Sequence, residues 1–179
     1  MIRRLRSEAG TTLIETAIAS GILLVVMAGL LSMAALATTY TENHGHLEAR
    51  TTEYAQDKLE QLLTLAFSNA VSNTVTFPTT DSGGTGLAVG GSTNTAAPGN
   101  GYVDWLDAKG NILGGGTTAP SAWFYERVWA ICYLQSDSTC PTTPATGLKR
   151  ITVTTTVRSS VGKALIPKST IVVLKSSKF

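Results

Sequence analysis

Residues 10–37 read GTTLIETAIASGILLVVMAGLLSMAALA, and this stretch decides the fold of the N-terminal part of the chain. From Thr16 to Thr41 there are 26 residues without a formal charge, and no proline interrupts them. A helix of about 20 apolar residues, at about 1.5 Å each, covers the ~30 Å hydrocarbon core of a membrane. Because arginines precede the stretch, we expect the N-terminus in the cytoplasm and the C-terminal body outside it.

The chain beyond its first ten residues carries no net charge. Charged residues make up 15% of the sequence, below the ~25% of ordinary soluble proteins. The net charge of +2 comes entirely from Arg3, Arg4 and Arg6 against Glu8, and the remaining residues hold 11 basic and 11 acidic side chains. A neutral body excludes the basic footprint of a nucleic-acid-binding protein and a polybasic membrane-binding surface. We expect no nucleic-acid partner.

Two cleavage sites are compatible with the apolar stretch. Ala35-Leu36-Ala37 has the A-x-A form of a secretory signal-peptide site, but the apolar run before it is longer than a typical signal sequence. Before the run, a short basic leader ends at Gly10, and Thr12-Leu13-Ile14-Glu15 leads into the helix. This second pattern resembles a type IV prepilin leader, whose common form is Gly-Phe-Thr-Leu-Ile-Glu. The chain departs from that form at Thr11, which stands where phenylalanine is usual.

The resemblance implies that a prepilin peptidase cuts between Gly10 and Thr11 and methylates the new amine. Gly10 has no Cβ, so a peptidase can approach its carbonyl closely. A carboxylate at the membrane boundary, as at Glu15, costs several kcal/mol (roughly) unless it is paired. In a filament, Glu15 of one subunit would pair with the Thr11 amine of its neighbour, an amine that exists only after cleavage. The simpler alternative is that Glu15 only interacts with the helix dipole, an interaction that stabilises by ~0.3–1 kcal/mol.

The helix is expected to continue without a proline as far as Phe67 and to become amphipathic over residues 41–68. Residues 11–40 would lie in lipid or in a filament core, and residues 41–68 would lay one face on a folded domain. That face is predicted to carry Thr51, Ala55, Leu59, Leu62 and Ala66. The other sides of the helix, which face solvent, are predicted to carry Glu48, Glu53, Asp57, Lys58 and Glu60.

Residues 69–121 are predicted to form a Gly/Thr-rich flexible region with a short hairpin at 102–113. From Pro78 to Gly101, 21 of 24 residues are Gly, Ser, Thr, Asn, Ala or Pro, which is typical of a connection and not of a core element. The oxygens of Asp104, Asp107 and Asn111 are assigned to turn chemistry, because no glutamate closes a calcium loop there.

Residues 122–179 are predicted to form an antiparallel β-sheet. The patterns are Ala122–Leu134, Leu148–Arg158 and Thr170–Lys175, rich in branched and aromatic residues. Short turns favour a meander with one apolar face on the amphipathic helix. The expected fold class is α+β, with a long N-terminal helix on a small antiparallel sheet, as in pilins.

The strand motifs are similar to those of PilV-like minor pilins and related pseudopilins. The matching segments are Tyr125-Glu126-Arg127-Val128-Trp129 and Leu148-Lys149-Arg150-Ile151-Thr152-Val153, and the helix segment Ala55–Leu62 is similar too. The resemblance implies a type IV pilus subunit that starts in the bacterial inner membrane, with a periplasmic body, and enters the filament by its helix among other pilin subunits. A minor pseudopilin of a type II secretion system remains an alternative, as does a membrane-anchored periplasmic binding module that never polymerises.

The two cysteines, Cys132 and Cys140, enclose seven residues. In an exported body they are candidates for a disulfide, which would stabilise by ~2–3 kcal/mol in the chain-entropy model; two free thiols are the alternative. No G-x-S-x-G, H-E-x-x-H or Cys-His pattern is present. We therefore expect no catalytic residues, no cofactor and no metal.

Overall fold

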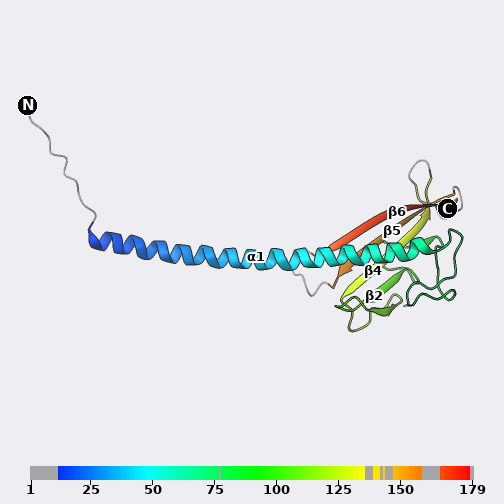
Figure 1. Ribbon diagram of the computed structural model, residues 1–179, viewed down its shortest axis with the longest axis horizontal. Helices are drawn as coiled ribbons and strands as arrows, with labels where there is room; N and C mark the ends of the chain where they lie inside the picture. Colours follow the sequence, from blue (N-terminus) through cyan, green and yellow to red (C-terminus); the bar gives the residue numbers. More distant parts are fainter. Residues whose placement is uncertain are drawn as a thin grey trace, which may run out of the picture. The chain divides into compact units, whose positions relative to one another are not determined.

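The structure is a computed structural model that describes residues 12–76, 78–135, 139–141, 143, 147–158 and 166–177. Helix α1 (Leu13–Thr64) is followed by strands that form one antiparallel sheet (Figure 1). The predicted α+β class is confirmed. The strands are β1 (Gly90–Gly91), β2 (Val103–Leu106), β3 (Ile112–Gly115), β4 (Tyr125–Tyr133), β5 (Leu148–Val157) and β6 (Lys168–Ser176).

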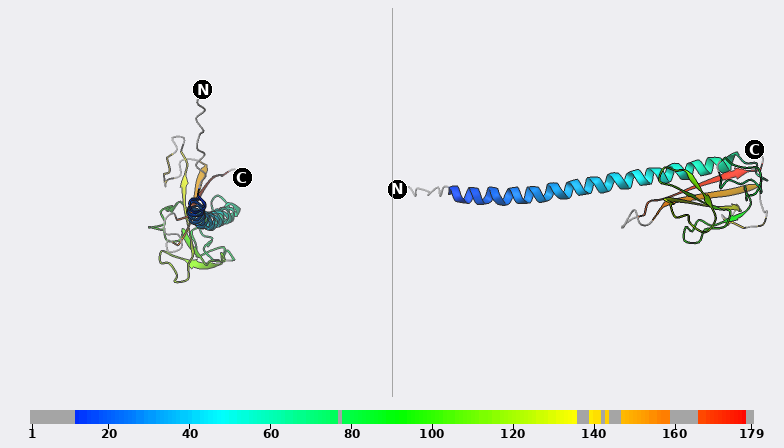
Figure 2. Two further views of the ribbon diagram at one scale, coloured as in Figure 1. Left: turned by 90° about the vertical axis from the view of Figure 1, so that its left-hand side faces the viewer. Right: turned by 90° about the horizontal axis from the view of Figure 1, so that it is seen from below.

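The chain divides into two compact units after Asn43. The first unit contains α1 as far as this residue. The second unit, which we call the body, comprises residues 44–179 and contains the rest of α1 and the sheet. Within the body, residues 44–64 of α1 lie along one face of the sheet (Figure 2).

The sheet has the strand order β3-β2-β4-β5-β6, and β1 adds a short pairing to β4. Strands β4, β5 and β6 form the meander predicted from the sequence, with Trp129 opposite Val153 and Val153 opposite Ile171. The hairpin expected over residues 102–113 forms from β2 and β3. It is not separate from the sheet, because β2 also pairs directly with β4, placing Asp104 opposite Arg127.

The main hydrophobic core lies between α1 and the sheet. Ala55, Leu59 and Leu62 of α1 pack there, as the spacing predicted. Ala66 was expected on the same face but is exposed, because α1 ends at Thr64 and the helical repeat stops before it. The other buried members of this core are Leu87, Tyr102, Trp129, Ile131, Ile151 and Val153.

The segment from Pro78 to Gly101 contributes to this core, contrary to expectation. Leu87 is fully buried, and its amide donates to the carbonyl of Asn69. Gly91 pairs with Ala130, and a Cβ on Gly91 would meet the carbonyl oxygen of Trp129. Small residues therefore let this segment approach β4 closely, which composition alone does not reveal.

A smaller cluster covers the opposite face of the sheet. Val103, Trp105 and Val128 are buried there, with the Trp123 ring at 5.1 Å from that of Trp105. Side chains alternate across a strand, so β4 is buried on both faces, with Val128 on one and Trp129 on the other.

Candidate functional site

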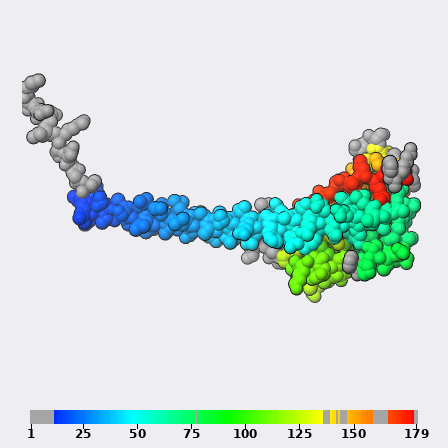
Figure 3. Space-filling model, viewed as in Figure 1, coloured from blue at the N-terminus to red at the C-terminus, as the bar shows by residue number. Residues whose placement is uncertain are grey.

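The N-terminal part of α1 presents a largely apolar surface. The side chains of residues 12–43 are exposed throughout, including Leu13, Ile14, Val25 and Leu31 (Figure 3). By length and composition the helix could cross a membrane. Extended exposed apolar surfaces are typical of segments that contact lipid or other protein.

The serine and threonine hydroxyl groups of this part of α1 are satisfied within the helix. Each donates to a backbone carbonyl three or four residues earlier, which removes the cost of placing a free hydroxyl in an apolar medium. These residues are Thr16, Ser20, Ser32, Thr38, Thr39 and Thr41.

Glu15 lies in the first turn of α1 and is exposed. Its backbone amide donates to the carbonyl of Thr12 at 2.9 Å. Its carboxylate makes no hydrogen bond or ion pair with any residue in the described part of the chain. The predicted cleavage bond Gly10–Thr11 and the Thr11 amine lie outside the described residues, so the cleavage and the pairing remain predictions.

The body holds a buried cluster of charged side chains where α1 meets the sheet. Lys58 comes from α1, Asp104 from β2 and Arg127 from β4, and their side chains are 0%, 0% and 1% exposed. The Lys58 Nζ donates to Asp104 Oδ2 at 2.8 Å. Arg127 donates to both oxygens of Asp104, from Nε to Oδ1 at 2.7 Å and from Nη2 to Oδ2 at 2.9 Å.

The remaining donors of the cluster are satisfied by α1 and its neighbours. Lys58 also donates to Gln61 at 3.1 Å and to the carbonyl of Thr74, and its Nζ lies 4.0 Å from the centre of the Trp129 ring. Arg127 Nη1 donates to the carbonyl of Tyr54 at 3.2 Å and to Asp57 at 2.8 Å. The cluster therefore ties α1 to two neighbouring strands by directional bonds.

The pKa values of these groups follow from burial and mutual attraction. Burial lowers the pKa of Lys58 to about 8, against the opposing effect of Asp104. Burial works to raise the pKa of Asp104, but the two cations outweigh it and the pKa lies below its usual range. For Arg127, burial is likewise outweighed by Asp104, which raises its pKa. At neutral pH all three groups are charged, as an ion cluster requires.

This cluster corrects two expectations from the sequence. Lys58 was placed on a solvent side of the helix, yet it is fully buried because Asp104 and Arg127 surround it with compensating charge. Asp104 was assigned to a turn, yet it lies inside β2 and faces the helix. A signal was available: Lys58 is three residues after Ala55 and four before Leu62, so it shares their face.

One lysine of the sheet satisfies a carbonyl in the last turn of α1, and a second lysine satisfies carbonyls beyond the end of the helix. The last turn of the helix contains no basic residue. Instead, Lys175 of β6 donates to the carbonyl of Leu63 at 2.7 Å, and Lys149 of β5 donates to those of Phe67 and Leu87 at 2.7 and 2.8 Å. Cations there complement the negative end of the helix dipole. The body thus secures both the face and the end of α1.

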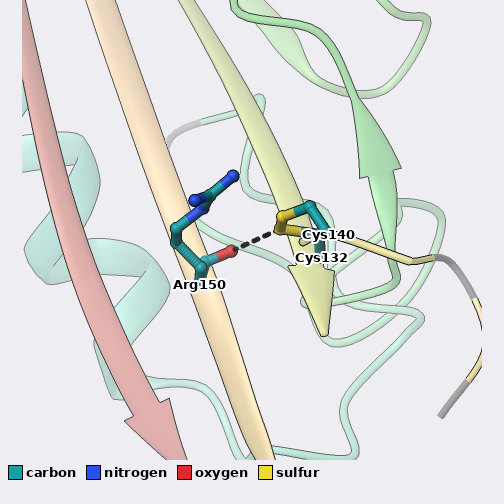
Figure 4. The surroundings of a disulfide bond; sticks show 3 residues. All are labelled: Cys132, Cys140 and Arg150. Carbon is teal, nitrogen blue, oxygen red and sulfur yellow. Dashed lines mark hydrogen bonds between the residues drawn. A yellow bond between two sulfur atoms is a disulfide. The ribbon is translucent and has the colours of Figure 1, made fainter. Parts of the chain in front are cut away.

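The predicted cysteine pair is joined in the structure. Cys132 lies in β4 and its Cα is 5.2 Å from that of Cys140, to which it is disulfide-bonded. The Cys132 Sγ lies 3.9 Å from the carbonyl oxygen of Arg150 on the neighbouring strand (Figure 4). The bridge therefore ties the segment after β4 back onto the sheet.

Comparison of the chain with protein-family models, with curated proteins and with solved structures finds no match.

Proposed function

We propose that this chain is a structural subunit of a type IV pilus, similar to the PilV-like minor pilins. A prepilin peptidase cuts after Gly10, and before assembly the subunit is anchored in the bacterial inner membrane with its body in the periplasm. It then enters the filament through residues 11–40, among other pilin subunits. Its role is in assembly, and it is not an enzyme.

One observation carries this proposal. The exposed, uncharged surface of α1 follows directly after Glu15, and its serine and threonine hydroxyls are bonded within the helix. Such a segment is suited to lipid and to a protein core alike, which a subunit that moves from a membrane into a filament requires. The single carboxylate at its start favours a specific partner, because an unpaired charge in either environment is costly.

The contacts of the body support the same role. A subunit that moves as one piece needs its exposed body held on the helix that anchors it. The Lys58–Asp104–Arg127 cluster and the lysines at the end of α1 supply this attachment. It uses directional bonds in addition to apolar packing.

The decisive experiment is the intact mass of the chain from cells with and without an active prepilin peptidase. Loss of ten residues only when the peptidase is present supports the proposal. Loss of 37 residues indicates a secreted domain, and an unshortened chain in both strains indicates a membrane-anchored binding module. Co-purification with sheared pili, rather than with a type II secretion complex, then separates a pilus subunit from a pseudopilin.

A further inference from the structure

A pocket of about 380 Å³ lies beside the disulfide on the sheet. Its floor includes Ala130 and Cys132 of β4 and Arg150 and Thr152 of β5, which are cross-strand partners in the register of the two strands. These positions alternate with Ile131 and Ile151 of the main core, so the floor lies on the face of the sheet opposite α1. Gly90 and Gly91 of β1, Thr93 and Cys140 also line it.

Arg150 is the only charged residue among the described residues that line this pocket. Its Nε is buried and has no hydrogen-bond partner among the residues that the structure describes. Figure 4 shows the Arg150 side chain next to the disulfide, on the neighbouring strand. The other arginines of the described chain, Arg50, Arg127 and Arg158, each donate to an acceptor.

A partly buried guanidinium without an acceptor is costly. The guanidinium presents its donors in a planar fork that matches the two oxygens of a carboxylate or phosphate. Thr93 and Thr152 line the same pocket, and each carries a hydroxyl that can serve as a neutral donor. The pocket volume falls at the lower end of the range for small-ligand sites, which favours a small anion.

We propose that this pocket binds a small oxyanion, a carboxylate or a phosphate group, held by the Arg150 guanidinium and the hydroxyl of Thr152. The site is independent of the cleavage after Gly10 and of assembly through α1. The proposed oxyanion would bind on the face of the sheet opposite α1.

The test uses the full-length, uniformly ¹⁵N-labelled chain in detergent micelles with the disulfide intact. Sodium phosphate and sodium acetate are titrated separately at constant ionic strength, adjusted with sodium chloride, and the amide signals of Gly90, Gly91 and Thr152 are followed. We expect saturable shifts with a Kd in the millimolar range for at least one of the two anions. Tighter binding of phosphate identifies a phosphate site, and tighter binding of acetate a carboxylate site.

Three variants make the test specific. Arg150→Gln is expected to weaken binding about tenfold or more, since it removes the charged fork. Thr152→Val keeps the shape of its side chain, loses the hydroxyl and is expected to weaken binding by about three- to tenfold. The control Arg158→Gln removes the same charge elsewhere on the body and is expected to bind as the unaltered chain does.

Two results would overturn the proposal. The first is the absence of a saturable shift with either anion. The second is unchanged binding in Arg150→Gln or, if that variant does not fold, unchanged binding in Thr152→Val.

Discussion

The Nζ of Lys58 lies 2.8 Å from Oδ2 of Asp104, and neither side chain is exposed to solvent. The two residues are 46 positions apart in the chain and belong to different kinds of element, a helix and a strand. Burying one such charge alone costs several kcal/mol (roughly), and a mutual bond with full hydrogen bonding offsets that cost. The pair therefore makes the docking of α1 on the sheet depend on a specific register.

Asp104→Asn is expected to destabilise the body by about 3–5 kcal/mol, because it leaves Lys58 and Arg127 buried without their shared counter-charge. Urea denaturation followed by tryptophan fluorescence measures the change. The matched control is Asp57→Asn, which removes the other carboxylate bonded to Arg127. Its side chain is 72% exposed, so its loss is expected to cost about 1 kcal/mol or less. Equal effects of the two substitutions would contradict a special role for burial.

The stability of the body is expected to rise between pH 8 and pH 9.5 through Lys58. Burial lowers the pKa of this lysine to about 8, whereas an unfolded lysine titrates near ~10.4. In that window the unfolded chain binds more protons than the folded one, so the free energy of unfolding increases with pH, by about 1–2 kcal/mol. The same measurement on Lys58→Met is expected to lack this rise. An identical slope in both proteins would show that another group is responsible.

Glu126 is expected to destabilise the body as pH rises. The residue is 4% exposed, its Oε1 has no hydrogen-bond partner in the described part of the chain, and burial raises its pKa to about 7. The folded chain therefore binds this proton more tightly than the unfolded chain, whose glutamates titrate near ~4.3. Stability from this group is present below about pH 4.3 and is lost as pH rises to about 7.

Glu126→Gln removes this titration, and at pH 8 it is expected to be about 1–2 kcal/mol more stable than the unaltered chain. At pH 4 the two are expected to be equally stable within about 0.5 kcal/mol. Chemical denaturation at both pH values measures this, with exposed Glu60→Gln as the control. A gain for Glu126→Gln that is the same at both pH values would argue against titration of Glu126.

Gly10→Val is expected to block maturation, because a branched side chain at this position keeps the peptidase from the carbonyl of the bond to be cut. Intact mass in cells that contain the peptidase measures the result. Gly21→Val is the matched control. Apart from its own turn of the helix, a Cβ at Gly21 meets no described atom within 4 Å, and the residue lies beyond the cleavage bond. Cleavage of Gly10→Val at the normal rate would place the processing site elsewhere.

Glu15→Ala is expected to be cut normally but to enter filaments at least about tenfold less often, equivalent to about 1.4 kcal/mol. The reason is that the substitution removes the counter-charge of the Thr11 amine in the neighbouring subunit. Quantitative immunoblots of sheared pili against whole cells measure incorporation. Glu42→Ala removes the next acidic residue along the chain, at the other end of the uncharged stretch, and is expected to have no effect. Normal incorporation of Glu15→Ala would refute the pairing.

Local pattern accounts for most of the fold. A long apolar run without proline can form only a helix in an apolar medium, because every backbone group must be bonded within the segment. The three- and four-residue spacing of Ala55, Leu59 and Leu62 predicts a buried helix face, and strands are predicted by the branched and aromatic residues of β4 and by the alternation in β5. The structure confirms these elements. The cysteine spacing likewise made Cys132 and Cys140 candidates for a bridge without any knowledge of the sheet.

Pairing between distant segments decided the rest. The burial of Lys58 is favourable only because β2 and β4 bring Asp104 and Arg127 to it, and no window of local sequence contains all three. The placement of β2 beside β4 and the burial of Leu87 depend in the same way on neighbours far along the chain. Hydrophobic periodicity is a property of neighbouring residues, whereas the compensation of a buried charge is a property of the assembled core.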